Sequence, residues 1–359
     1  MTKAEGVWLW LSMTGGVGAR TAHRLVTFFG SEEAVWSAAP QQLERAAGVS
    51  LAQELAGSRS GDAINAHVRD CRRAGITPLT PASPGYPAGL LDLCDPPCVL
   101  YAKGDLSLLE RDGITIVGTR RHTRYGERIT AQLSRELAQA GLVVVSGLAE
   151  GLDAVAHRAA LDAGGGTIAV LGNGVDVYYP AVNAALQDDI ARCGLLLSES
   201  PPGKRANKGS FPMRNRVLAA LTRATLVTEA GEKSGALLTA EYAVDCGREL
   251  FVVPGNIDSP ASYATNRLLR TSAEVVLETS DVLDRLGLAA PEEQPAQPSI
   301  KLDEEERKIV QCLLHEPQSF DELSVLTGFL PPRLNSLLTR LELKGIIDQS
   351  AGRVYAMKR

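Results

Sequence analysis

The sequence predicts an α/β protein built on an extended Rossmann-like, doubly wound and mostly parallel sheet, with a helical domain before it and a winged helix after it. Three observations carry this prediction. Apolar, often β-branched segments recur between residues 110 and 285, glycine or polar turns follow several of them, and a Pro- and Gln-rich stretch precedes a short C-terminal piece. With 359 residues, 45% hydrophobic and 22% charged, the composition is that of a globular chain of two to three domains.

Residues 1–70 are expected to form a separate helical domain. The segment MTGGVGARTAHRLVTFFGS (13–31) places a glycine-rich turn between two helical patterns, as in a helix-hairpin-helix or sterile-alpha-motif-like (SAM-like) unit. Such a hairpin can present backbone N–H groups to DNA phosphates, although the same glycines also simply permit a tight turn. The prolines between residues 83 and 97 then predict extended connecting chain, because proline breaks helices.

Residues 71–288 are expected to form the Rossmann-like domain. Strands that are apolar on both faces are typical of a parallel sheet covered by helices on each side. In such a sheet ligands bind beyond the carboxyl ends of the strands. The predicted strands are ITIV (114–117), LVVVS (142–146), TIAVL (167–171), LLLSE (195–199), ATLVTE (224–229), ELFVVP (249–254) and EVVLE (274–278).

Three strand-to-helix turns carry glycine, and together they favour an anion site. The turns begin at Gly118, Gly147 and Gly172. A glycine that opens a helix leaves free backbone N–H groups at the positive end of the helix dipole, and Arg120 would add a forked cation there. None of the three is a dinucleotide fingerprint or a P-loop, and glycine also occurs in such turns for steric reasons alone.

The segment GKRANKGSFPMRNR (203–216) is a localised positive patch in a chain whose formal net charge is −5. The negative total requires any nucleic-acid site to be local. An aromatic side chain beside cations can stack a base while its phosphate is held, which is the role predicted for Phe211. A solvated loop, with Phe211 in the core, is the alternative. The cations of the patch are Lys204, Arg205, Lys208, Arg214 and Arg216.

Candidate catalytic and metal-binding residues are few. Glu199 and Glu229 each end a strand and are either catalytic carboxylates or ion-pair anchors for an arginine of the patch. Asp153 and His157 have the i,i+4 spacing of a metal-ligand pair or of a structural pair. The six cysteines are scattered, so free thiols are expected rather than disulfides or zinc. The sequence therefore predicts no catalytic residue, no cofactor and no metal.

The C-terminal region follows an expected linker at 289–299 and covers residues 300–359. Three helical patterns at 303–316, 319–328 and 331–345 precede a β-hairpin pattern at 346–358, which is the order of a winged helix. Residues 301–359 contain equal numbers of basic and acidic residues. A neutral winged helix is as suited to a protein partner as to DNA, so its role stays open.

These segments together resemble the DNA-processing protein A (DprA, also called Smf) family over essentially the whole chain. Seven segments occur in the family order, which makes the resemblance specific. Ala220 departs from the usual glycine, and small residues replace glycine-rich turns within 260–276. The segments are IVGTRRHTRYG (116–126), SGLAEGLDAVAH (146–157), LGNGVDVYYP (171–180), SESPPG (198–203), FPMRNRVLAAL (211–221), TEAGEKSGALLTAEYA (228–243) and VVPGN (252–256).

The resemblance implies a non-enzymatic homodimer that binds single-stranded DNA and hands it to the RecA recombinase during natural transformation. A cytoplasmic location is expected because MTKAEGVWLW (1–10) lacks the pattern of an export leader. It implies that Gly118 and Arg120 take phosphates, that Lys208 takes the backbone and that Phe211 stacks a base. Single-strand DNA-binding protein is a further candidate partner, and no membrane is involved. The full predicted single-stranded DNA site is Gly118, Thr119, Arg120, Ser146, Gly147, Asn173, Lys204, Lys208, Phe211, Arg214, Asn215 and Arg216.

Two other functions are compatible with a Rossmann-like fold, because fold alone does not choose a function. One is a hydrolase of nucleotides or phosphoribosyl groups, with Glu229 as the acid and Arg214 as the phosphate clamp. The other is a sensor of a small nucleotide that signals through the winged helix. The segment from Lys208 to Phe211 favours DNA, because a stacking track along a polymer is superfluous for a mononucleotide.

Overall fold

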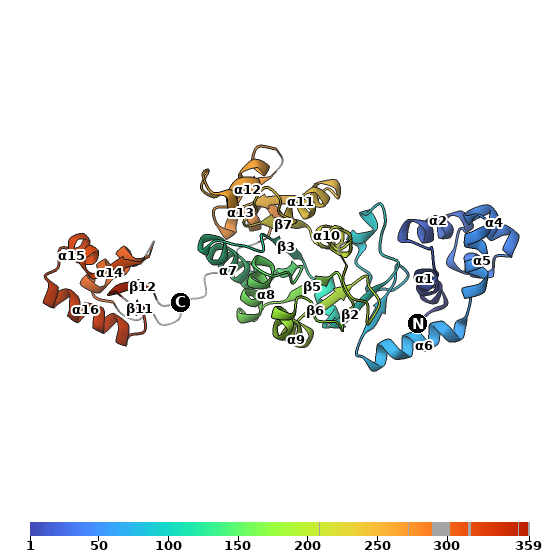
Figure 1. The fold of residues 1–359 in the computed structure, drawn as a ribbon, viewed down its shortest axis with the longest axis horizontal. Helices are drawn as coiled ribbons and strands as arrows, with labels where there is room; N and C mark the ends of the chain where they lie inside the picture. Colours follow the sequence, from blue (N-terminus) through green and yellow to red (C-terminus); the bar gives the residue numbers. More distant parts are fainter. Residues whose placement is uncertain (208, 272, 289–301, 315–316, 351, 358–359) are drawn as a thin grey trace. The chain divides into compact units, whose positions relative to one another are not determined.

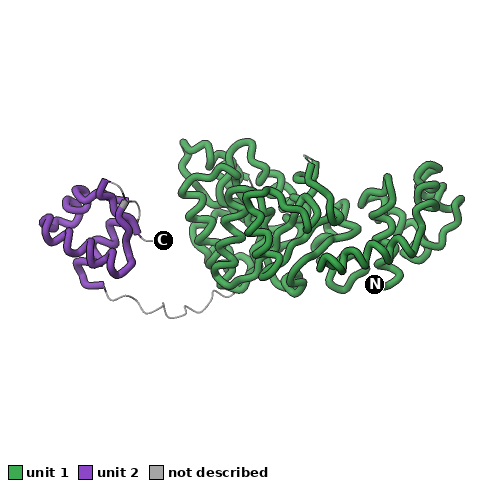
Figure 2. The backbone as a smooth tube through the Cα atoms, turned by 60° about the horizontal axis from the view of Figure 1, so that its bottom comes forward, with its two compact units in different colours: residues 1–291 green, residues 292–359 purple. Residues whose placement is uncertain are grey.

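The computed structural model describes residues 1–207, 209–271, 273–288, 302–314, 317–350 and 352–357. Contacts divide the chain into two compact units, residues 1–291 and residues 292–359 (Figure 2). The predicted linker at 289–299 lies outside the described residues, and the predicted domain limits stay predictions. Within the described ranges, no helix combines the length and the hydropathy needed to cross a membrane.

Six helices open the first unit, and local capping accounts for several of their ends. Thr2 and Glu5 form a capping box at the start of α1, and the side chains of Ser31 and Ser60 cap α3 and α6. Gly16 has a φ of 78° in the turn before α2, a conformation that favours glycine. The helical prediction is confirmed, and the SAM-like assignment stays a prediction. The helices are α1 (Lys3–Met13), α2 (Ala19–Phe29), α3 (Glu32–Ser37), α4 (Pro40–Ala47), α5 (Val49–Ser58) and α6 (Gly61–Arg73).

A nine-stranded sheet in the order β1-β2-β6-β5-β4-β3-β7-β8-β9 forms the centre of the first unit (Figure 1). The seven neighbouring strands β6-β5-β4-β3-β7-β8-β9 are all parallel, which confirms the predicted sheet. The predicted strands are present as β3 (Gly113–Val117), β4 (Val143–Ser146), β5 (Thr167–Leu171), β6 (Leu195–Ser198), β7 (Ala224–Val227), β8 (Glu249–Val252) and β9 (Glu274–Val275).

Two antiparallel strands extend the sheet beyond the prediction. β1 (Thr77–Leu79) pairs with β2 (Leu100–Gly104), and β2 pairs with β6. β2 begins three residues after Pro97, so the proline pattern that predicted connecting chain ends just before it. The short apolar run that follows these prolines was the available signal for β2.

Helices cover both faces of the sheet because successive strand residues point to opposite sides. Val144 packs in one apolar cluster with α7 (Arg124–Gln139), α8 (Leu152–Asp162) and α13 (Thr279–Leu286). Val143 and Val145 pack in another with α10 (Ser210–Leu221) and α11 (Ala236–Asp245). A third cluster joins the N-terminal helices to β5, β6 and α9 (Ala184–Cys193), so the apolar core is continuous between these regions.

The strand order reverses beside β3. The chain moves outward from β3 through β4 and β5 to β6, and then returns to place β7 on the other side of β3. A crevice outside the carboxyl ends of the strands is expected at such a switch point. The turns after β3, β4, β5 and β7 are therefore the first place to look for a site.

The second unit has the helix and hairpin order of a winged helix, as predicted. Asp303 with Glu306 and Ser319 with Glu322 form capping boxes that set the starts of its first two helices. Its strands form an antiparallel sheet in the order β10-β12-β11 around a separate apolar cluster. The elements are α14 (Glu304–Leu313), β10 (Gln318–Ser319), α15 (Phe320–Thr327), α16 (Pro331–Leu343), β11 (Ile347–Ser350) and β12 (Val354–Met357).

Candidate functional site

The glycines of two strand-to-helix turns are required by close packing. A Cβ at Gly118 would collide with the side chain of Leu152, and a Cβ at Gly147 would collide with the guanidinium of Arg214. The steric explanation for glycine therefore applies at both positions. These close approaches bring the turns after β3 and β4 together with α8 and α10.

An aromatic and cationic cluster lies at this edge of the sheet. The Arg120 guanidinium carbon is 5.7 Å from the Phe211 ring centroid, within cation–π range. Phe211 is half-buried at the start of α10, and the Tyr179 ring centroid is 5.5 Å from its own. Tyr179 was missed by sequence reasoning, although its place in the third glycine-bearing segment was a signal. The cluster offers ring faces beside an exposed cation.

Arg120 and Phe211 line hollows on two sides. A small one is lined also by Gly172, Asn173 and Tyr179. A larger one, of about 450 Å³, is lined by Thr119 and further cations. The cations in the larger hollow are Arg120, Arg121, Lys233 and the buried Arg214. The arrangement can therefore hold an anionic ligand with a planar group.

Arg214 lies beneath this cluster and is held by the backbone. Its Nη1 donates to the carbonyl oxygens of Gly147 and Val170, both at 2.5 Å, and its Nε donates to Asn215 Oδ1 at 3.1 Å. Burial lowers the pKa of Arg214 to about 10. Burial raises the pKa of Asp153, against the opposing effect of the Arg214 charge. Arg214 therefore remains a cation under the site, with little of its surface exposed.

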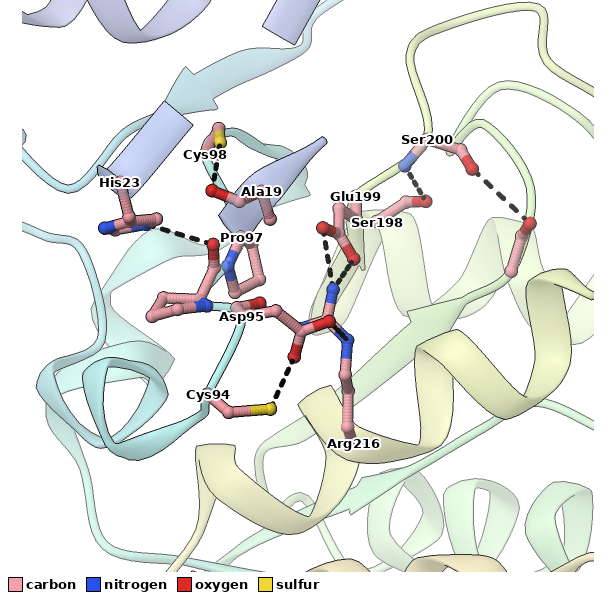
Figure 3. Close-up of polar contacts among 12 residues, drawn as sticks. Ala19, His23, Cys94, Asp95, Pro97, Cys98, Ser198, Glu199, Ser200 and Arg216 are labelled. Atoms are coloured by element: carbon pink, nitrogen blue, oxygen red, sulfur yellow. Dashed lines mark hydrogen bonds and ion pairs between the residues drawn. The ribbon is translucent and has the colours of Figure 1, made fainter. Parts of the chain in front are cut away.

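Arg216 is committed to an ion-pair cluster (Figure 3). Its Nη2 donates to both carboxylate oxygens of Glu199, at 2.8 and 2.6 Å, and its Nε lies 3.5 Å from Asp95 Oδ2. The side chain is only 2% exposed. Of the two interpretations of Glu199, the geometry supports the ion-pair anchor. The prediction that Arg216 contacts DNA is not supported, because its charge is already balanced.

Two further predicted residues have structural partners. Ser146 is fully buried and its hydroxyl donates to Ile116 O at 2.6 Å, so it ties neighbouring strands together instead of facing a ligand. Asn173 donates through Nδ2 to Val177 O at 2.7 Å and fixes the turn after β5, while it still lines the small hollow.

The remaining predicted positions divide by exposure. Thr119 donates its backbone N–H to Glu229 O at 2.8 Å and lines the larger hollow. Asn215 is buried and donates to Gly235 O at 3.3 Å. Lys204 is exposed in the loop after β6. Lys208 lies outside the described residues.

The acidic and histidine candidates are also structural. Glu229 accepts from the backbone N–H and the hydroxyl of Thr123, at 2.8 and 2.6 Å, which fixes the start of α7. His157 Nδ1 lies 2.7 Å from Thr167 Oγ1, and burial, together with the Arg214 charge, lowers the pKa of His157 to about 3. Within the described ranges, no three His, Cys, Asp or Glu side chains gather as a metal site would require.

Fold and site together define a Rossmann-like protein with a cationic, aromatic pocket at the carboxyl edge of its sheet, followed by a winged helix. The family model for DNA recombination-mediator protein A matches residues 77–287, and the model for the DprA winged helix domain matches residues 293–353. The chain belongs to this DprA/Smf family.

Relatives and solved structures agree with this assignment. Protein Smf of Synechocystis is 34% identical and aligns over 98% of both chains. The crystal structure of DNA processing protein A from Streptococcus pneumoniae is 31% identical, with a TM-score of 0.70, over 79% of this chain and 98% of that one. A structure describing the single-stranded DNA binding mode of the Helicobacter pylori protein is 34% identical, with a TM-score of 0.53, over 59% and 95%.

Proposed function

We propose that this protein is a recombination mediator that binds single-stranded DNA at the carboxyl edge of its sheet. The observation that carries the proposal is the packing of Arg120 and Tyr179 against the half-buried Phe211 ring. A base can stack on an aromatic face while a neighbouring cation takes its phosphate, and every base has such a face. The described single-strand binding of the Helicobacter pylori relative supports the same function.

The set of contact residues that we propose is smaller than the set predicted from the sequence. We propose Arg120, Phe211 and Lys204 as direct contacts to DNA. Gly118 and Gly147 let Leu152 and Arg214 pack closely against the two turns. Lys208 stays in the proposal on its motif alone. Thr119, Asn173, Arg214 and Asn215 shape the pocket, whereas Ser146 and Arg216 leave the set of contacts.

We further propose that the protein acts in the cytoplasm during natural transformation, protecting incoming single strands and loading RecA onto them. Single-strand DNA-binding protein remains a proposed partner. A homodimer is supported by the edge strand β9, which pairs only with β8 among the described strands. Val275 is 44% exposed and Leu277 is 77% exposed, and exposed apolar side chains at a sheet edge favour pairing with a second copy.

The proposed role is non-enzymatic, and the geometry offers little support for the hydrolase alternative. That alternative needs Glu229 free to act as an acid and Arg214 free to clamp a phosphate. Glu229 instead accepts two hydrogen bonds from Thr123, and Arg214 donates to two backbone carbonyls. Neither group is positioned to act on a bound substrate.

A binding titration with single-stranded oligonucleotide, duplex and mononucleotides at several salt concentrations tests the function. A site that uses three to five cations is expected to give a log–log salt slope of roughly −2 to −4 for the single strand, at about −0.7 per neutralised phosphate. We expect the single strand to bind more tightly than the duplex or the mononucleotides. Preference for a mononucleotide with a slope near zero would identify a small-molecule pocket instead.

A further inference from the structure

A cavity of about 780 Å³ lies between the N-terminal helices and the carboxyl edge of the sheet. Met13, Val17 and Arg20, around the turn from α1 to α2, form one wall. Lys204, Ser210 and Met213, from the loop after β6 and the start of α10, lie on the other. Its volume is within the roughly 300–1,000 Å³ typical of ligand sites.

The N-terminal wall is fixed to the rest of the unit by specific contacts (Figure 3). In α2, His23 Nε2 lies 3.1 Å from Pro96 O, and Arg20 Nη2 donates to Cys94 Sγ at 3.1 Å. The same short segment supplies Asp95, whose carbonyl oxygen accepts from Arg216 Nη1 at 2.9 Å. The two walls are therefore joined through residues 94–96.

The cavity adjoins the pocket at Phe211. Leu171, Gly172 and Arg214 line both spaces. A strand whose base stacks on Phe211 can continue past these residues. The cavity provides a path for its next nucleotides.

The lining residues offer cations for the phosphates and apolar side chains for the bases of a single strand. Arg216 is paired with the two carboxylates of Asp95 and Glu199, and Arg20 and Lys204 are exposed cations on opposite walls. Lys204 has no ion-pair partner within 4 Å among the residues that the structure describes. Met13 and Met213 are 44% and 48% exposed, and thioether side chains adapt readily to flat apolar groups such as bases.

We propose that the single strand stacked on Phe211 continues into this cavity, where Arg20 and Lys204 contact its phosphates from opposite walls. The N-terminal helices are then part of the DNA-binding surface. This proposal rests on the proposed function, because it extends the strand held at the Phe211 site.

Fluorescence anisotropy with oligo(dT) of about four and about twelve nucleotides separates the two spaces, because only the longer strand reaches the cavity. Arg20→Ala and Lys204→Ala are each expected to weaken the longer strand about fourfold near physiological salt and to reduce its salt slope by about 0.7, the effect of one lost phosphate contact. The shorter strand should bind the Arg20→Ala variant as it binds the wild type. Arg24→Ala is the matched control, because Arg24 is exposed on the same helix and does not line the cavity.

Three results would overturn the extension or its basis. Equal losses for both lengths in Arg20→Ala would mean that this charge acts only through its long-range field. Unchanged binding of both lengths by Arg20→Ala and Lys204→Ala, while Phe211→Ala weakens both, would leave the function intact and remove the extension. No effect of Phe211→Ala on either length would refute the proposed function itself. Thermal melting checks folding, and Arg20→Gln, which keeps a donor for Cys94, replaces the alanine variant if that one unfolds.

Discussion

The basic residues at the carboxyl edge of the sheet and those of the winged helix differ in what surrounds them. At the sheet edge, Arg120 and Lys204 are exposed, and no acidic group lies within ion-pair distance of either among the described residues. In the winged helix, Arg333 Nε donates to Glu305 at 3.0 Å, and Arg340 and Lys344 both pair with Glu306.

This difference shows that counting charges does not locate a nucleic-acid site. By sequence, the whole chain is negative and the winged helix is neutral. In the structure, the cations of helix α16 are paired with acids at the start of α14, which the charge count does not reveal. Exposed ion pairs contribute little stability, but they cancel the local field that would attract a phosphate. We therefore expect the sheet edge to attract single strands more strongly than the winged helix does, although its unit contains many acids.

The largest expected effect is that of Phe211→Ala on single-strand binding. A base–aromatic stack is worth roughly 1–3 kcal/mol, so the affinity should fall about five- to a hundredfold, with little dependence on base sequence. Melting measured beside the titration distinguishes this role from a core position. A midpoint far below the wild type with affinity retained per folded molecule would show that the ring only supports the fold.

Acid should destabilise the first unit before the winged helix. Burial lowers the pKa of His157 to about 3, so its stabilising contribution is present above the unfolded value near 6.5 and is lost as the pH falls. The expected loss is about 2 kcal/mol at pH 5, at 1.36 kcal/mol for each pH unit below 6.5.

Glu306 provides the contrast in the winged helix. Burial alone would raise its pKa, but hydrogen bonds and ion pairs, the largest from Lys344, lower it on balance. Its contribution should therefore persist until the pH falls below its ordinary value of 4.5. Tryptophan fluorescence reports the first unit alone, because Trp8, Trp10 and Trp36 all lie there. A pH-independent midpoint between 7 and 5, or His157→Gln losing as much stability as the wild type over that range, would contradict the assignment to His157.

A matched pair of arginine variants compares the two regions directly. Arg120→Ala should weaken single-strand binding about fourfold near physiological salt and lower the slope by about 0.7. Arg333→Ala should change neither quantity, because its charge is already paired with Glu305. Similar losses in the two variants, measured by anisotropy at several salt concentrations, would abolish the distinction between the regions.

The smallest effect is expected from removal of residues 292–359. The candidate site lies wholly within the first unit, and each unit has its own apolar core. The shortened chain should therefore melt cooperatively and bind single strands as the full chain does. A shortened chain that folds but no longer binds single strands in the same titration would place part of the site in the winged helix.

The sequence allowed the central fold to be predicted because its signals are local. Apolar runs of four to five residues such as β5 and β7 reveal buried parallel strands, and the helix and hairpin pattern after residue 300 reveals a winged helix. The strands β1 and β2 were not predicted, because their pairing joins distant segments and the nearby prolines obscured the strand pattern. Phe211 and Arg120 could be proposed as neighbours because both follow strands of one parallel sheet.

The sequence by itself determined the parallel sheet and the winged helix, the positive segment 203–216 and most of the candidate residues for DNA binding. Only the tertiary structure decided which cations are available, because pairing depends on side chains that are far apart in the chain. Arg216 and Arg120 look alike in the sequence, yet one meets Glu199 and Asp95 in the interior and the other lies against Phe211 at the surface. A buried charge needs a partner within the protein, whereas an exposed charge is solvated and remains available to a ligand. Which charges are buried is set by the packing of the whole unit.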